Sequence, residues 1–471
     1  MNAPWTLSRL WPSKFTLLLL LSVQALATGI SLDVDSDESI KSAASTVVYD
    51  LITFYTGNNT GDVAGNLPSP YYWWEAGGLF GSLINYWAYT GDDTYNDITV
   101  QALIHQAGSD GDFMPANQTL DEGNDDQCFW AISAMMAAER NFTNPPSSDP
   151  GWLAMVQAVF NEQTTRWDAS TCDGGLRWQI FTWNAGYDYK NSIANGCFFN
   201  IAARLARYTG NATYAKWATR AWDWTETVGL IGSSYEIYDG SSDTTNCSSL
   251  DNDRWTYNTG VYLLGAAIMY NYTSSLSTNA STNTSSIWKA RVDGLLSSAN
   301  HFFSTNSSSE NVMYERQCEL IDNCDTDELS FKAYLSRWMA EAAQVAPYTY
   351  NTIMSYLRAT AQAAVAQCEG GSTGTYCGFE WTTGTYDGST GVGQQMGVLE
   401  AVQGLLIGSV RGPYTASTGG TSKGNSAAGT GDSSDSAVSF SPITTADRVG
   451  AAILTAAILG GVLSAVYLMI S

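Results

Sequence analysis

The chain has 471 residues, and its 45 Asp and Glu against 21 Lys and Arg give a formal net charge of −24 at pH 7. A surface this acidic repels phosphate backbones, which excludes nucleic acid as a partner. His105 and His301 are the only histidines, which argues against a Ser-His-Asp triad or a His-based zinc site. We expect no metal site and no cofactor. The 17 Trp and 26 Tyr suit stacking on sugar faces, although most will belong to the core.

The N-terminus has the order of a secretory signal peptide over residues 1–27. Arg9 and Lys14 precede an apolar stretch at 17–21, and the small-residue motif Ala25-Leu26-Ala27 follows. Removal of this segment takes the net charge to −26, because it contains two basic residues and no acid.

The C-terminus resembles an attachment signal for a glycosylphosphatidylinositol (GPI) anchor. A Ser-, Gly- and Thr-rich linker at 412–442 precedes a hydrophobic tail at 443–471 that would be removed on maturation. A single membrane span is the alternative, because the 22 residues from 449 to 470 could cross a bilayer. The missing cytoplasmic Lys or Arg argues against a span. The attachment residue stays open between Asn425 and the segment 432–436.

Cysteines and sequons agree with a secreted protein. Eight cysteines in such a chain indicate disulfides before metal ligands. The sequence does not fix their pairing, but Cys318 with Cys324 and Cys368 with Cys377 are near enough to close small loops. Nine N-x-S/T sequons are present, at Asn58, Asn117, Asn141, Asn211, Asn246, Asn271, Asn279, Asn283 and Asn306.

Between residues 34 and 411 two kinds of helix alternate. Six helices open in a Gly-, Asn- or acid-rich loop and continue with apolar residues at three- and four-residue spacing. They cover 75–90, 125–141, 195–209, 258–272, 327–344 and 391–408. Six more polar helices cover 36–55, 92–107, 151–167, 211–228, 286–303 and 348–367. The alternation predicts an all-α fold, an (α/α)6 barrel of six helical hairpins over residues 28–411.

The inner helices of such a barrel all start at one end, where loops of about 20 residues at 56–74, 108–124 and 168–191 gather. Polar and aromatic clusters fall on these loops and helix starts, so we expect an aromatic-lined, acid-centred cleft there. Tryptophan at a helix entrance is, however, about as often a packing residue. The candidate substrate-binding residues are Trp73, Trp74, Glu75, Arg177, Trp178, Gln179, Asn195, Asp387 and Gln394.

Asp125 and Asp126 are the candidate catalytic residues, at the start of the second inner helix. An Asp in the first turn of a helix is also an ordinary cap, but the position at the cleft end favours chemistry. Repulsion and burial let one of the pair hold a proton near neutrality, as an acid and a nucleophile require. Neighbouring side chains favour the separation of about 5–5.5 Å used by retaining glycosidases over the about 6.5–9.5 Å of inverting ones.

Three motifs carry a resemblance to a known family: Glu122 to Gln127, Gly174 to Gln179 and Asn191 to Gly196. With them the chain resembles glycoside hydrolase family 76 over nearly its whole length, and within it the fungal Dfg/Dcw group of GPI-anchored wall proteins. The resemblance implies that Asp125 is the nucleophile and Asp126 the acid/base of a retaining, endo-acting α-1,6-mannosidase or transglycosidase.

The resemblance also implies ligands and a location. The donor would be α-1,6-mannan or the mannose of a GPI-anchor glycan, and β-glucan is a candidate acceptor. The protein would sit at the cell surface on a GPI lipid in the outer leaflet of the plasma membrane, with transfer into the wall as a further step. A non-catalytic mannan-binding scaffold is the alternative function, and it differs in tolerating Asp125→Asn.

Overall fold

The computed structural model describes residues 29–118, 122–276, 279–430 and Thr455. The predicted signal peptide, residues 431–442 of the predicted linker and the predicted tail apart from Thr455 lie outside the described residues. Within the described ranges, no helix combines the length and hydropathy needed to cross a bilayer.

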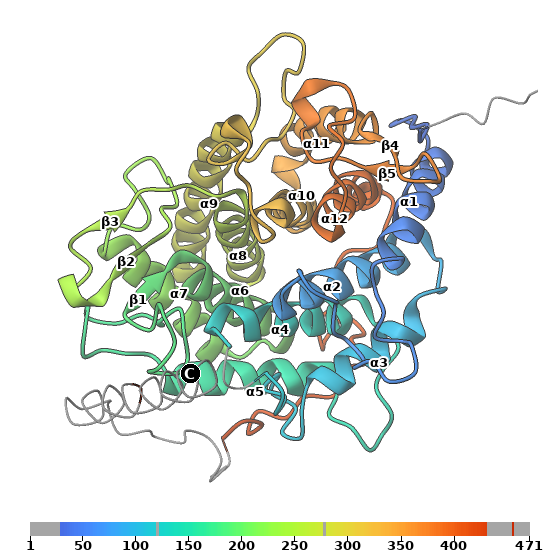
Figure 1. Cartoon of the computed structure of the whole chain (residues 1–471). Helices are drawn as coiled ribbons and strands as arrows, with labels where there is room; N and C mark the ends of the chain where they lie inside the picture. The colour runs from blue at the N-terminus through green and yellow to red at the C-terminus, as the bar shows by residue number, and fades with distance from the viewer. Residues whose placement is uncertain (1–28, 119–121, 277–278, 431–454, 456–471) are drawn as a thin grey trace, which may run out of the picture.

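Six helices form an inner ring. They are α2 (Trp73–Thr90), α4 (Asn124–Arg140), α6 (Ser192–Thr209), α8 (Thr256–Ser275), α10 (Glu328–Val345) and α12 (Val392–Gln403). Each packs against the next, and α12 returns to α2, which closes the ring (Figure 1). The outer helices are α1 (Asp37–Ile52), α3 (Asn96–Gln106), α5 (Trp152–Thr165), α7 (Ala212–Thr227), α9 (Asn279–Ala299) and α11 (Tyr350–Val365). The predicted (α/α)6 barrel is confirmed.

The inner helices approach closely because small residues face large ones. A Cβ atom on Gly77 of α2 would lie 3.0 Å from the Trp130 ring of α4, and Gly78 faces Tyr334 of α10 in the same way. Trp130 and Tyr334 are fully buried. Glycine therefore admits the aromatic rings that fill the barrel, at the cost of some helix propensity.

The two ends of the barrel differ in their connections. After an inner helix the chain turns tightly, as at Gly91 and Gly210, which take left-handed backbone angles. Before each inner helix the loop is long, and these loops hold the small strands β1 (Tyr189–Asn191), β2 (Gly240–Ser242), β3 (Leu250–Asp251), β4 (Cys368–Gly370) and β5 (Tyr376–Cys377). These loops also hold short 3-10 helices, η1 (Asp243–Thr245), η2 (Asn300–Phe302), η3 (Glu319–Ile321) and η5 (Trp381–Thr383), whereas η4 (Pro347–Thr349) follows α10 and η6 (Gly404–Gly408) follows α12. β1, β2 and β3 form an antiparallel sheet in that order.

Three disulfides tie the loops. Cys318–Cys324 and Cys368–Cys377 pair as expected, and Cys172–Cys247 joins the loop before α6 to the turn after β2. The expectation that all eight cysteines form disulfides is wrong for Cys128 and Cys197, which are buried free thiols on α4 and α6. A buried thiol packs as a small apolar side chain, so a core helix accepts it without a bridge.

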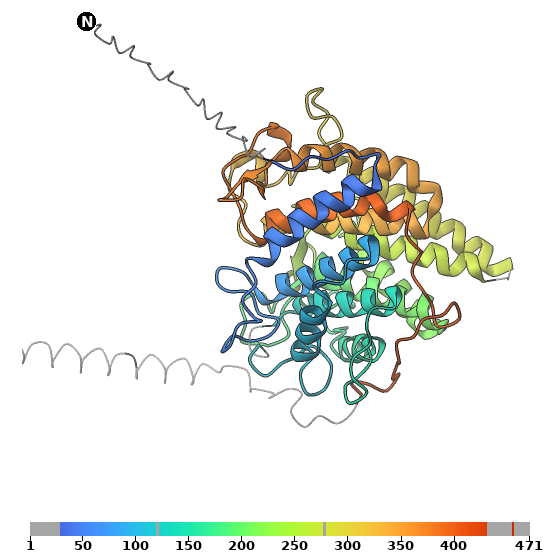
Figure 2. The same ribbon diagram turned by 90° about the vertical axis from the view of Figure 1, so that its right-hand side faces the viewer.

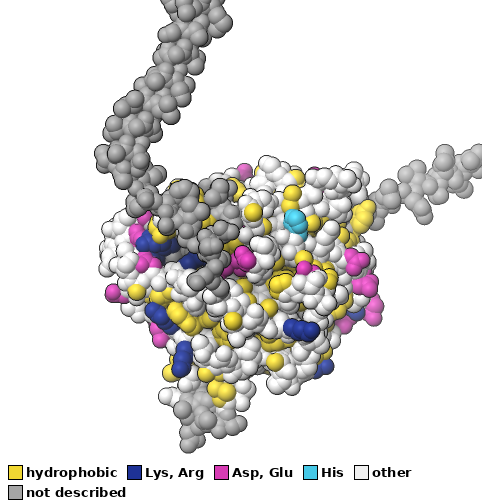
Figure 3. Space-filling view, turned by 90° about the horizontal axis from the view of Figure 1, so that it is seen from below, with side chains coloured by type: hydrophobic (Ala, Val, Ile, Leu, Met, Phe, Trp, Pro, Cys, Tyr) yellow, Lys and Arg dark blue, Asp and Glu magenta, His cyan; other side chains and the backbone are white. Residues whose placement is uncertain are grey.

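The segment 411–430, which we call the strap, lies along the outside of the barrel (Figure 2). The Asn141 amide donates to the Gly419 carbonyl at 2.9 Å, and the Asn161 amide donates to the carbonyls of Ser426 and Ala428. Part of the predicted linker is therefore packed on the folded domain. The face seen from below shows a few separate Lys and Arg side chains among mostly uncharged ones (Figure 3).

Candidate active site

A cavity of about 170 Å³ opens at the end of the barrel where the inner helices begin. Its walls come from the starts of α2, α4, α8 and α10 and from the loops between them. The lining residues are Trp74, Asp125, Asp126, Phe129, Trp178, Tyr189, Asn191, Asp239, Tyr257, Asp327 and Phe331. A larger groove of about 650 Å³ lies beside α7, but it shares none of these residues and contains no neighbouring pair of carboxylates. The acid-lined cavity is the candidate active site.

The start of α4 fixes the two aspartates. The Gly123 backbone N–H donates to Asp126 Oδ2 at 2.6 Å, and the Asp126 N–H donates to Asp125 Oδ1 at 3.0 Å. Asn191, at the start of α6, donates to Asp125 Oδ2 at 3.4 Å. The backbone and side-chain N–H groups of Asn124 donate to the carbonyls of Trp178 and Arg177, which fastens the loop before α6 to the start of α4. Both carboxylates are thus held by backbone that is itself anchored.

Burial and mutual repulsion hold protons on this pair. Asp125 is 7 % exposed, and burial followed by the charge of Asp126 raises its pKa well above the ordinary value. Burial raises the pKa of Asp126 to about 6, although the hydrogen bond that the Gly123 N–H donates lowers it. Coupled carboxylates titrate as a unit, so the pair retains a proton near neutral pH. One protonated and one ionised carboxyl group is the state in which a retaining glycosidase begins its reaction.

Two further acids face the pair. Burial raises the pKa of Asp239 to about 6 and that of Asp327 to about 7. Tyr189 donates its hydroxyl to Asp239 at 2.9 Å, and the Trp74 indole N–H donates to Asp327 at 2.9 Å. The cavity lining contains four aspartates and no Lys or Arg. The site therefore favours neutral or cationic ligands.

Aromatic rings form the apolar walls. Tyr257 and Phe331 stack with ring centroids 3.8 Å apart, and Trp74 packs on Phe129 at 4.6 Å. Trp178 is 36 % exposed at the opening. Rings beside carboxylates match the two kinds of surface on a sugar, whose C–H face is apolar and whose rim bears hydroxyls.

Four of the eleven predicted site residues come together in this cavity: Trp74, Asp125, Asp126 and Trp178. Trp73 lies outside the lining and donates to Gln106 at 2.7 Å. Glu75 is fully buried, accepts from the Tyr72 N–H at 2.7 Å, and has its pKa raised by burial to about 8.

The remaining predicted residues also lie outside the lining and hold loops in the structure. Arg177 pairs with Asp168 at 2.8 Å and with Asp243. The Gln179 side chain accepts from Asn184, and Asn195 bonds in both directions to the backbone of Leu176. Asp387 accepts the N–H groups of Phe379, Glu380 and Ser389, and Gln394 is buried at the start of α12. A direct role of these residues in binding stays a prediction.

The sequence did not predict five of the lining residues, Phe129, Tyr189, Asp239, Tyr257 and Phe331. Asn191 and Asp327 stood in segments that the sequence assigned to the cleft end, without a role of their own. Asp239 lies just before β2, in the long loop that leads to the fourth inner helix. The spacing of apolar residues predicts helices but not the path of such a loop. The signal for Asp239 was a carboxylate within a long loop before an inner helix.

The comparison with protein families now bears on this site. The model of glycosyl hydrolase family 76 matches residues 39–417. The chain belongs to glycosyl hydrolase family 76. It is 46% identical over 431 residues to mannan endo-1,6-alpha-mannosidase DCW1 of Saccharomyces cerevisiae, covering 91% of this chain and 92% of that protein. It is 43% identical over 433 residues to mannan endo-1,6-alpha-mannosidase DFG5 of the same yeast, covering 91% and 92%.

Solved structures agree with this family assignment. Dfg5 from Chaetomium thermophilum, crystallised in complex with glucosamine, has a TM-score of 0.79 and 44% identity, covering 84% of this chain and 97% of that one. The GH76A α-1,6-mannanase from Salegentibacter sp. HEL1_6 shares the fold at a TM-score of 0.59 and 17% identity, covering 78% and 99%. The family member described here is a glycoside hydrolase with an (α/α)6 barrel.

Proposed function

We propose that this family 76 enzyme is a retaining, endo-acting α-1,6-mannosidase or transglycosidase that acts on mannan or GPI-anchor mannose in fungal cell-wall assembly. The observation that carries the proposal is the adjacent, backbone-anchored pair Asp125 and Asp126 in an acid-lined cavity. The activity in the names of relatives at 43–46% identity supports the substrate class.

The reaction divides between the two aspartates. The reaction starts from the state in which Asp126 holds the proton that the coupled pair shares. Asp125, held by Asn191, attacks the anomeric carbon of a mannose, and the bond from that carbon to the leaving oxygen breaks as Asp126 gives that oxygen its proton. Asp126 then takes a proton from an incoming hydroxyl, whose oxygen displaces Asp125 from the sugar. Water as the incoming group gives hydrolysis, and a sugar hydroxyl gives transfer. The net configuration at the anomeric carbon is retained.

The charge of the cavity bears on the donor. Asp239 and Asp327 join the catalytic pair without a Lys or Arg among the lining residues. The related Dfg5 from Chaetomium thermophilum was crystallised with glucosamine, a sugar with an amino group. We propose that the donor here is a GPI-anchor glycan, because four aspartates favour a cationic amino sugar beside the mannose. A β-glucan chain is the proposed acceptor.

The sequence of the two ends of the chain supports a proposal for the location. We propose that the protein enters the secretory route and is held at the cell surface by a GPI lipid in the outer leaflet of the plasma membrane, from which transfer into the wall is a further step. Cells that make the chain without residues 443–471 should release it into the medium. Persistence of the truncated protein at the surface would contradict a GPI anchor.

Mass spectrometry of two variants tests the roles of the aspartates. After mixing with an activated α-mannoside, Asp126→Ala should carry a covalent mannosyl adduct, because a good leaving group needs little protonation. Asp125→Ala should carry none. An adduct on Asp125→Ala alone would reverse the assignment, and inverted products from the unmodified enzyme would remove the covalent mechanism.

Product analysis separates hydrolysis, transfer and simple binding. The full chain is incubated with an α-1,6-mannan oligomer, alone and with a β-glucan acceptor. Shorter mannans indicate hydrolysis, whereas a mannosylated glucan indicates transfer. A non-catalytic scaffold would bind the oligomer, release no product and keep its affinity in Asp125→Asn.

A further inference from the structure

The groove beside α7 has a volume of about 650 Å³ and lies apart from the proposed catalytic cavity. The disulfide Cys172–Cys247 lines it together with Trp224, whose indole N–H donates to the Cys172 carbonyl at 2.9 Å. The Arg220 guanidinium lies over the rings of Trp167 and Trp217, at 4.9 and 4.6 Å from their centroids. An apolar floor beside cationic and hydroxyl side chains is a surface that a sugar can occupy.

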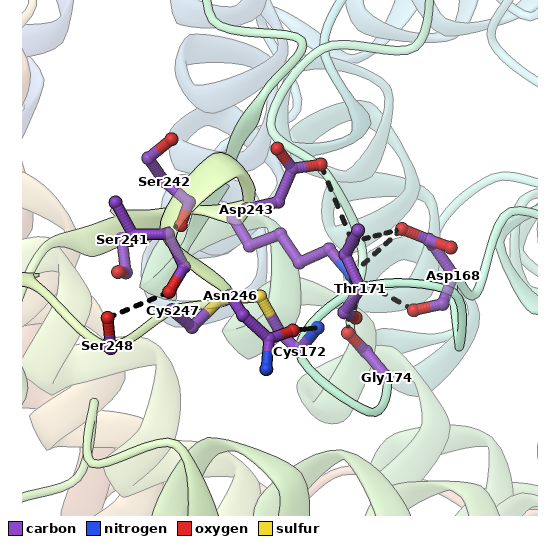
Figure 4. The surroundings of a disulfide bond; sticks show 12 residues. Asp168, Thr171, Cys172, Gly174, Ser241, Ser242, Asp243, Asn246, Cys247 and Ser248 are labelled. Atoms are coloured by element: carbon purple, nitrogen blue, oxygen red, sulfur yellow. Dashed lines mark hydrogen bonds and ion pairs between the residues drawn. A yellow bond between two sulfur atoms is a disulfide. The ribbon is translucent and has the colours of Figure 1, made fainter.

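Asn246 stands at the edge of this groove within the sequon Asn246-Cys247-Ser248. Its backbone is left-handed, with φ of 51°, in an exposed turn that follows η1. Its side-chain oxygen accepts from the Cys172 N–H at 2.6 Å, which fixes the plane of the amide. In Figure 4 the amide nitrogen points away from this bond, and no described residue accepts a hydrogen bond from it. That nitrogen is free to carry a substituent.

Two other sequons lack this freedom. Asn141 ends α4, and its amide nitrogen donates to Gly419 of the strap at 2.9 Å. The amide nitrogen of Asn271 donates to the Val345 carbonyl at 2.9 Å while its oxygen accepts from Arg207 at 3.0 Å. A chain that carries a glycan on either residue could not form that tertiary contact, so the folded, secreted protein should lack both glycans. The structure thus distinguishes sequons that sequence alone leaves equivalent.

We propose that Asn246 carries an N-linked glycan whose first sugars lie in the groove beside α7. The amide nitrogen displaces the diphosphate of a lipid-linked oligosaccharide from the anomeric carbon of its first sugar, forms the C–N bond and loses a proton. Transfer precedes closure of Cys172–Cys247, because the bridge would hold the tripeptide in its turn. The seated sugars then cover the bridge, which has a sequence separation of 75 and ties down the loop that carries Trp178.

Occupancy is tested on the full chain recovered from a secreting yeast. Peptide mass spectrometry should find a glycan on Asn246, none on Asn141 or Asn271, and loss of the Asn246 glycan in Ser248→Ala. Ser248→Ala retains the hydrogen bond that the Cys172 N–H donates to Asn246, whereas Asn246→Gln would disturb it. Ser248→Thr is the matched control, because it keeps the sequon. Unmodified Asn246 in the recovered wild-type protein would overturn the proposal.

Seating is tested by the rate at which an endoglycosidase releases the glycan from native protein. Release from Asn246 in the native protein should be about tenfold slower than release from occupied sequons in the denatured protein. A tenfold difference is equivalent to about 1.4 kcal/mol of contact with the groove. Arg220→Ala should remove most of this protection without changing occupancy, and Lys41→Ala on α1 is the control for loss of an exposed cation. Equal native and denatured release rates would overturn the seat.

Discussion

Two groups of buried carboxylates in the barrel differ in their partners. Toward the end where the inner helices finish, Glu139 pairs with Arg204 at 2.5 Å, and deeper in the barrel Glu400 pairs with Arg337 at 2.8 Å. At the mouth, Asp125 is buried and Asp126 is partly buried, without a cation among the residues that line the cavity. A paired charge serves packing, whereas an unpaired carboxyl group keeps a proton that it can transfer. This difference marks the acid-lined cavity as the chemical site.

The largest expected effect falls on the unpaired acids. Asp125→Asn and Asp126→Asn should each lower turnover by about 10³-fold or more, because each removes a group that forms or breaks a bond. Folding stability should stay the same or rise, because a repulsive buried pair is relieved. Product formation and thermal unfolding of both variants measure the two effects. Turnover within tenfold of wild type would remove the pair from the mechanism.

The paired acids predict the opposite outcome. Arg204→Ala leaves Glu139 buried without its partner and should destabilise the fold by about 3–5 kcal/mol, while turnover per folded molecule stays near wild type. Replacement of both residues by Leu should restore much of the stability. Denaturant unfolding and rates corrected for the folded fraction give the comparison. A stable Arg204→Ala variant with lost turnover would contradict the division between paired, structural acids and unpaired, catalytic ones.

The sequence predicted the arrangement of the ends better than the contacts at them. Twelve helices follow from apolar spacing and turn residues, and a ring of hairpins places Asp125 at the mouth without further information. The sequence placed the start of α9 at 286, whereas the helix begins at Asn279. The early turns were missed because Asn, Ser and Thr dominate them and give no apolar spacing. The sequence could not place Asp239 in the cavity, because a loop that folds over the mouth shows no regular spacing of apolar residues.

The same limit applies to the residues with structural partners. Arg177 lies in a motif next to the cavity, but the ion pairs with Asp168 and Asp243 that hold it depend on residues far along the chain. Pattern marks the region of a site, and only tertiary contacts separate the residues that face a ligand from those that support them. Cys128 and Cys197 are a further example, because their burial in the core, which spacing in the sequence does not reveal, accompanies their free thiol state.

A third prediction concerns pH. Burial raises the pKa of Asp126 and Asp239 to about 6, of Asp327 to about 7 and of Glu75 to about 8. Because these folded-state values exceed the unfolded ones, the stability that protonation contributes is full below about pH 4 and is lost as the pH rises from about 4 through the folded values of 6 to 8. Melting temperature against pH should fall over that range, and Asp327→Asn should flatten the fall. A melting temperature that rises from pH 5 to 8 would contradict the raised values.

The smallest effect is expected at the strap, which belongs to neither end. Its composition predicts a linker, yet backbone groups of 411–430 bond to Asn141, Asn161 and Gln157 of the barrel. A chain ending at 411 should be less stable than one ending at 430 by about 1–3 kcal/mol, since several hydrogen bonds only partly outweigh the entropy of ordering the segment. Denaturant unfolding of both chains measures the difference.

A point variant separates docking of the strap from the mere presence of its residues. A Cβ atom on Gly420 would collide with the Tyr208 hydroxyl, so Gly420→Ala in the longer chain should reproduce part of the loss. Gly412→Ala is the matched control, because a Cβ there meets nothing nearer than 3.9 Å. Turnover should be unchanged in all of these chains, because the strap lines no part of the acid cavity. Equal stability of the two truncated chains would return 412–430 to the role of a linker that rests on the barrel without stabilising it.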